Sequence, residues 1–304
     1  MKLRNNIIFL LCLLICLSCS KEENLVPDND PFSSFNISDL KIENYVNRVF
    51  IDIIGREPID EELDAEVEVL KDSSLNRESR VALVTKLMED TTFRENEFSY
   101  HAAYIQNLYN LAKARCIESV GDDEIQREIG LALNGAYRDS LVGNWDGYYN
   151  NLEKVRRYRA VIQSRVLMEE GLMDFHRCFA FMIDNGIYDV LNMNTFNFVR
   201  ASFDQLLWRL PSEQEYENAF NMIEFHEKRE LFGEVGSDKS DYIRILIDSP
   251  GMLEGMVIWA YQTLLNREPT PSEVYTLMQE YAQSKDIGYV ITQIVVTDEY
   301  ASFR

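Results

Sequence analysis

The 304-residue chain is predicted to be all-α, because apolar residues recur at steps of three and four through most of its length. No stretch alternates between apolar and polar residues over several positions, which is the pattern of a half-buried strand. A third observation is a phrase that occurs three times, as IIGREPIDEEL (53–63), LLWRLPSEQEY (206–216) and LLNREPTPSEV (264–274). Its residues favour a helix end, a turn and a new helix start. The fold class follows from these three features.

The first residues have the composition of an export signal. Lys2 and Arg4 precede eleven apolar residues, 7–17, a stretch too short to span a bilayer as a helix. We therefore expect residues 1–18 to be a signal peptide. The polar residues that follow, with two prolines, predict a tether over 19–36.

The end of this signal, LSCSKEE, resembles the lipoprotein box of bacteria. That resemblance implies cleavage before Cys19, which would carry the lipid, with a plain secretory signal as the alternative. SKEE directly after the cysteine is similar to the export tag of Bacteroidota surface lipoproteins. Together they imply a protein that is anchored in the outer membrane by lipid and displayed at the cell surface.

The net charge of −21 limits the kinds of partner that the protein is expected to bind. Such an acidic chain is not expected to bind nucleic acid or an anionic lipid surface. It suits a soluble surface protein, or one that meets a basic partner. With 46% hydrophobic residues the chain can also bury a substantial core.

The repeated phrase is interpreted as a structural element. In each copy an arginine is placed to neutralise the negative end of the preceding helix, and a proline stops its continuation. A glutamate then stands at the third position of a new helix, where Ser212 and Thr270 complete capping boxes. In the first copy Ile59 takes the capping place, so Asp60 is expected to cap instead. The residues are Arg56, Pro58, Glu62, Arg209, Pro211, Glu215, Arg267, Pro269 and Glu273.

The residue before each arginine should differ between copies. Gly55 and Asn266 suit a left-handed residue just past the helix end, whereas Trp208 predicts a variant exit. We expect helical repeats over 37–95 and, for the second and third copies, 198–304. A central helical region over 96–197 lacks the phrase. The whole is expected to be one compact domain or two closely joined lobes.

Two uncharacterised families resemble these copies. The phrase, its aromatic first helix and the closing TDEY look like a repeat of secreted bacterial proteins. The first copy with LMEDTTFRENEF is similar to a domain that accompanies cytochrome modules in planctomycete proteins. Neither resemblance implies a catalytic residue, and the absence of CxxCH gives no reason to expect haem.

The remaining cysteines, Cys116 and Cys178, could pair as a disulfide in an oxidising compartment, or be buried free thiols on helices. The chain has three histidines and lacks HExxH, GxSxG and a phosphate-binding glycine loop, so no metal site and no cofactor are predicted. His226, in FHEKRE, is expected on a charged helix face.

One aromatic segment could bind sugars. Trp145, Tyr148 and Tyr149 lie beside asparagines, and aromatic rings with amide groups can stack on and hydrogen-bond a glycan. The alternative is a loop that packs on the core.

The leading hypothesis is a non-enzymatic outer-membrane lipoprotein that acts as a helical interaction or scaffold module and contacts another envelope protein. Two alternatives stay open. One is a glycan-binding accessory lipoprotein. The other is a hydrolase with a site in the central region, built from His101, His176 or Cys178 with carboxylates.

Overall fold

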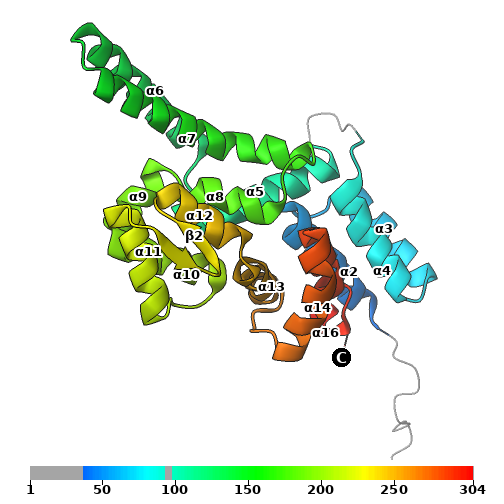
Figure 1. Cartoon of the computed structure of the whole chain (residues 1–304). Coiled ribbons are helices and arrows are strands. Elements are labelled where there is room, and N and C mark those ends of the chain that lie inside the picture. Colours follow the sequence, from blue (N-terminus) through cyan, green and yellow to red (C-terminus); the bar gives the residue numbers. More distant parts are fainter. Residues whose placement is uncertain (1–36, 93–97, 304) are drawn as a thin grey trace, which may run out of the picture. The chain divides into compact units, whose positions relative to one another are not determined.

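Fifteen helices and one short β-hairpin make up the described residues, 37–92 and 98–303, in a computed structural model of the chain (Figure 1). By their contacts, Asp39–Arg304 form one unit. The all-α prediction is confirmed. The signal, Cys19 and the tether lie outside the described residues. Among the described helices, none has the length and apolar content that a membrane crossing requires.

The elements follow one another in a simple order. The first copy contains α2 (Asp39–Ile54), α3 (Asp60–Asp72) and α4 (Arg77–Glu89). The central region contains α5 (Tyr100–Ile117), α6 (Asp122–Leu141), α7 (Trp145–Glu169), α8 (Phe175–Ile183) and α9 (Gly186–Asn192). The second copy contains α10 (Thr195–Leu207), α11 (Glu213–Phe225), β1 (Arg229–Leu231), β2 (Glu234–Gly236) and α12 (Lys239–Asp248). The third contains α13 (Pro250–Leu265), α14 (Pro271–Ser284), α15 (Ile287–Val295) and α16 (Asp298–Ala301).

The antiparallel pair β1–β2 departs from the expectation for FHEKRE, which was wrong about a charged helix. Helix α11 ends at Phe225, and His226 adopts a left-handed conformation with φ +55°. Phe232 and Gly233, both at positive φ, then form the turn between the strands. The left-handed residue ends the helix before the charged run begins.

The first helix of each copy buries the face that the spacing predicts. On α2 the buried residues are Ile42, Tyr45, Val46, Val49, Phe50, Ile53 and Ile54. Helices α10 and α13 pack against each other at close range. The approach is so close that a Cβ added at Gly255 would overlap the carbonyl oxygen of Leu206. Gly255 therefore sets the distance between the second and third copies.

The carboxyl ends of these three helices receive side chains from other elements. Such ends carry carbonyls without an intrahelical partner. Asn107 of α5 donates to the carbonyls of Asp52 and Ile53. Arg115, two turns further along α5, donates to those of Asp204 and Gln205. Arg48 of α2 donates to that of Leu264. The central helix α5 and the first copy thus hold the repeated units in place.

Helices α6 and α7 form a long antiparallel hairpin, and its distal end extends away from the other helices of the unit (Figure 1). Helix α6 packs chiefly on α7, through Ile125, Ile129, Ala132 and Ala136. The two alanines let the two helices approach closely. Gly135 also permits this close approach, since a Cβ there would meet the side chain of Asn151.

Candidate functional site

The three copies of the repeated phrase form the same turn. In each, the arginine binds both carboxylate oxygens of the glutamate six residues later and also donates to the carbonyl of the next residue. The glutamate accepts the backbone N–H of the residue that caps the new helix. The guanidinium lies over an aromatic ring of the preceding helix, with centroid distances of 5.9, 5.2 and 5.0 Å. We call this unit the Arg–Glu clamp.

The guanidinium of each copy binds the glutamate that follows, and its expected effect on the preceding helix end stays a prediction. One expectation about the phrase was wrong. Asp60 does not cap α3; Ile59 holds the capping place and its N–H donates to Glu62. Ser212 and Thr270 do form capping boxes with Glu215 and Glu273. Each arginine pairs with the glutamate of its own copy, and Arg267 also binds Glu299 of α16.

Trp208 also corrects an expectation, since it adopts the left-handed conformation, φ +51°, that Gly55 and Asn266 adopt in the other copies. This conformation is unfavourable for a bulky residue. The Trp208 ring compensates by two contacts: its Nε1 donates to Gln262, and the Arg115 guanidinium lies 4.2 Å from its centroid. The exit is therefore common to all three copies.

The clamp glutamates are strongly acidic. Burial would raise the pKa of Glu62, but hydrogen bonds from Arg56, Tyr100 and the Ile59 N–H outweigh it and lower the pKa to about 2. Hydrogen bonds from Arg209 and Arg267 lower the pKa of Glu215 and Glu273 to about 2 as well. All three carboxylates are ionised at neutral pH, which keeps the clamps closed.

His176 and Cys178, two of the side chains named for the hydrolase alternative, lie in the core. Cys116 and Cys178 are free buried thiols, and Cys178 Sγ lies 3.4 Å from the Ser164 hydroxyl. Burial raises the pKa of the Cys178 thiol to about 12, so it is not a thiolate at neutral pH. His176, two residues earlier on α8, is also buried, and burial lowers its pKa to about 4.

The aromatic segment proposed for glycan binding lies at the distal end of the α6–α7 hairpin. Trp145 is 56% exposed and Tyr149 is 65% exposed, so neither packs on the core. The Tyr148 ring contacts both, at interplanar angles of 83° and 75°. The rings therefore stand edge to face, and neighbouring rings do not combine into one flat stacking surface.

These aromatic residues belong to a larger apolar strip. Leu133, Tyr137 and Leu141 share one face of α6, because they follow at four-residue steps, and Trp145 and Tyr149 do the same on α7. On each helix the row is rotated in the same direction away from the residues that contact the other helix. Because the two helices are antiparallel, the two rows therefore lie on the same side of the hairpin. All five side chains are exposed. We call these five residues the hairpin strip.

Several polar groups around the hairpin turn bind one another. Asp139 accepts side-chain amide hydrogens from Asn144 and Asn151, and its carbonyl accepts the N–H of Val142 and of Asn144. Between Gly130 and Leu152 the sequence has just three charged residues, of which Asp139 is one. Such a surface loses little hydration when an apolar partner covers it.

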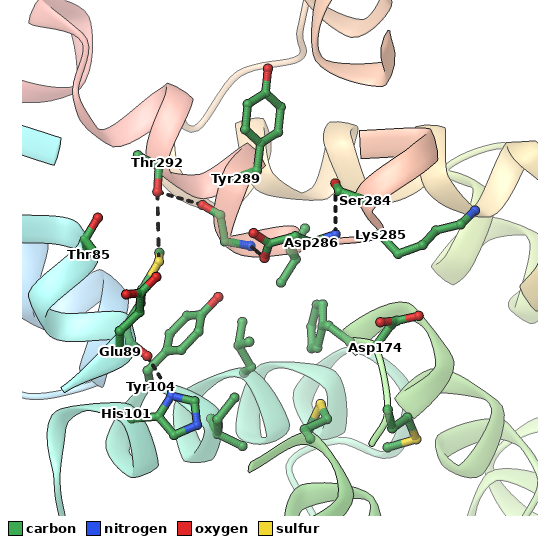
Figure 2. Close-up of a pocket in the computed structure, with 18 of the residues that line it drawn as sticks. Thr85, Glu89, His101, Tyr104, Asp174, Ser284, Lys285, Asp286, Tyr289 and Thr292 are labelled. Carbon is green, nitrogen blue, oxygen red and sulfur yellow. Dashed lines mark hydrogen bonds between the residues drawn. The ribbon is translucent and has the colours of Figure 1, made fainter. Parts of the chain in front are cut away.

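A separate pocket lies between the first copy, the central region and the third copy (Figure 2). Its volume is about 640 Å³, which is in the range of small-molecule sites. The floor is apolar and includes Met88, Ile105, Leu108, Met168 and Phe175. The rim carries the carboxylates of Glu89, Asp174 and Asp286.

His101 lines this pocket, but both of its ring nitrogens face backbone carbonyls. Nδ1 lies 2.6 Å from the Met88 oxygen, and Nε2 lies 3.3 Å from the Glu169 oxygen. The hydrolase alternative thus finds one of its three named residues at the pocket, because His176 and Cys178 do not line it. Within the described residues, no group of three or more histidine, cysteine or acidic side chains is arranged to hold a metal ion.

Sequence reasoning missed this pocket because its lining residues come from segments as far apart in the sequence as Thr85 and Gln293. No family model, curated protein or solved structure matches the chain.

Proposed function

We propose that the protein is a lipid-anchored helical interaction module of the bacterial cell envelope, and that its α6–α7 hairpin contacts another envelope protein. The lipoprotein box at Cys19 supports the anchor, and the SKEE segment supports display at the cell surface of the outer membrane. The proposed working part is the hairpin strip.

One observation carries the proposal: the strip exposes large apolar side chains on a hairpin whose first helix packs chiefly on the second. Tyr137 is 63% exposed and Leu141 is 68% exposed. Contiguous exposed apolar residues of this kind mark interaction surfaces. Aromatic residues at such places also contribute disproportionately to binding.

Photocrosslinking in intact cells tests the proposal. A benzophenone amino acid at Tyr149 should give a discrete higher-mass adduct with one envelope protein. The matched control is Lys154, five residues further on α7 and about 140° around the helix, which is also exposed. The benzophenone at that position should give a much weaker adduct.

Equal adducts from both positions would show that the contact does not depend on the strip. Recovery of the monomer alone from Tyr149 would count against the interaction function itself. The adduct should also disappear when Tyr137 and Leu141 are both replaced by asparagine, a change that leaves the buried face of α6 intact.

The glycan-binding alternative rests on the exposure of Trp145 and Tyr149 beside Asn144 and Asn150. Because the neighbouring rings are nearly perpendicular, each ring would stack on a sugar separately. A glycan array with the wild-type protein and Trp145→Ala decides between the two. Binding that is lost in the variant supports the alternative, and an array without any response removes it.

A further inference from the structure

We propose that the pocket between α4, α5 and the α14–α15 connection binds a small organic cation, namely a protonated amine on an apolar body. This site is separate from the hairpin strip and does not depend on the proposed function. The inference rests on the distribution of charge, on the apolar floor and on one largely buried tyrosine whose hydroxyl faces the pocket without a partner among the described residues.

The rim of the pocket is acidic. Glu89 comes from α4, Asp174 precedes α8, and Asp286 precedes α15, so three separate segments bring carboxylates to one opening (Figure 2). The carboxylates of Glu89 and Asp174 make no hydrogen bond or ion pair with the described residues, and the Asp286 carboxylate uses one oxygen to accept the N–H of Gly288. Lys285 is the one lysine or arginine among the described lining residues, and its side chain points away from Glu89 and Tyr104.

The second observation is Tyr104, which lies on α5 below this rim. Its side chain is more than nine-tenths buried, and its hydroxyl points into the pocket (Figure 2). That hydroxyl has no hydrogen-bond partner among the described residues. A tyrosine as deeply buried as Tyr104 normally has one, so its hydroxyl is available to a ligand in the pocket. Burial, together with the charge of Asp286, raises the pKa of Tyr104 well above its usual value, so the neutral phenol is present as an acceptor and a donor.

These features complement one class of ligand. An ammonium group can donate to the Tyr104 oxygen and to a rim carboxylate, and its positive charge is attracted by the acidic rim. The carbon body then covers the apolar floor formed by Leu108, Met168 and Phe175. An anion would meet the acidic rim, and a neutral polar molecule would leave the floor uncovered.

Saturation-transfer NMR on the detergent-solubilised protein tests the preference for a cation. The three probes share a six-carbon chain and differ only in the terminal group and its charge. Hexylamine should bind saturably, hexan-1-ol at least tenfold more weakly, and hexanoate least. Raising the salt from about 0.05 to 0.5 M should weaken the amine alone, because screening acts on charge. Equal binding of all three probes, or no saturable amine binding at millimolar concentration, overturns the proposal.

Variants locate the site. Glu89→Gln combined with Asp286→Asn keeps side-chain shape and the cap on Gly288, and should weaken hexylamine about tenfold. Tyr104→Phe, which removes only the oxygen, should weaken it about threefold. Glu280→Gln is the control, since Glu280 is exposed and lies outside the pocket. Wild-type affinity in both pocket variants would contradict the assignment, as would an equal loss in the control.

The same ammonium chemistry could come from a free amine or from a lysine side chain of a partner. A diamine, 1,6-diaminohexane, and a capped lysine, N-acetyl-lysine amide, separate these sources. Tighter binding of the diamine points to a free amine, and tighter binding of the capped lysine points to a protein side chain. Failure of both probes rejects the site and leaves the hairpin proposal untouched.

Discussion

The Glu62 clamp gives the sharpest prediction for stability, because it is the least exposed of the three. The side chain of Glu62 is 9% exposed, against 22% for Glu215 and 31% for Glu273. Among the described residues its carboxylate accepts two N–H groups of Arg56, the N–H of Ile59 and the hydroxyl of Tyr100. Glu62→Gln removes the charge and turns an amide toward the guanidinium.

The magnitude follows from these contacts. Hydrogen bonds to a charged group contribute about 1.5–3 kcal/mol each, and glutamine keeps one acceptor oxygen. We therefore expect Glu62→Gln to lower the free energy of unfolding by about 3 kcal/mol. The more exposed Glu215→Gln should lower it by about 1 kcal/mol, since exposed ion pairs contribute little.

Urea unfolding followed by circular dichroism at 222 nm measures both changes. If Glu62→Gln costs less than Glu215→Gln, or less than about 1 kcal/mol, the clamp does not stabilise the turn as described. Adding Arg56→Met to Glu62→Gln supplies a further check. Because the unpaired cation is then removed, the double variant should lose less than the sum of the single variants.

Three further predictions concern other parts of the molecule. Because the clamp glutamates have folded-state pKa values of about 2 against an ordinary 4.5, their stabilisation is present above pH 4.5 and is lost as the pH falls toward 2; the urea midpoint should fall over that window, and less so when all three are glutamine. Gly255→Ala should lower the melting temperature by several degrees in a thermal scan, because its methyl group overlaps the Leu206 carbonyl, whereas Gly130→Ala, with open space, should not. Cys116 and Cys178 should resist a thiol reagent until urea unfolds the chain, since burial raises both pKa values; fast modification of the native protein would contradict their placement.

The sequence predicted local features well, because helix starts and ends depend on neighbouring residues. The buried face of α2 and the capping boxes at Ser212 and Thr270 are of this kind. The clamp was missed although both of its residues were named. Residues six positions apart do not face each other on a helix, and it is the non-helical turn between the two helices that brings the arginine and the glutamate together.

Tertiary features were less accessible from the sequence. Trp208 adopts a conformation that its residue type disfavours, and the compensating contacts come from α5 and α13. The aromatic segment at Trp145 was identified, but its place at the end of a hairpin depends on how α6 packs on α7. The acidic pocket is formed by three segments that lie far apart in the sequence, and no local pattern shows that they meet. The predicted boundaries of the repeats and the signal stay predictions.

The central claim is that the hairpin strip carries the interaction function. The direct measurement is the mass of complexes that a lysine-reactive crosslinker captures in intact cells. Wild-type protein should appear in one defined complex. A variant with Tyr137, Trp145 and Tyr149 all replaced by asparagine should reach the same cellular level and run as the monomer. If that variant enters the same complex to the same extent, the hairpin is not the contact and the account is wrong.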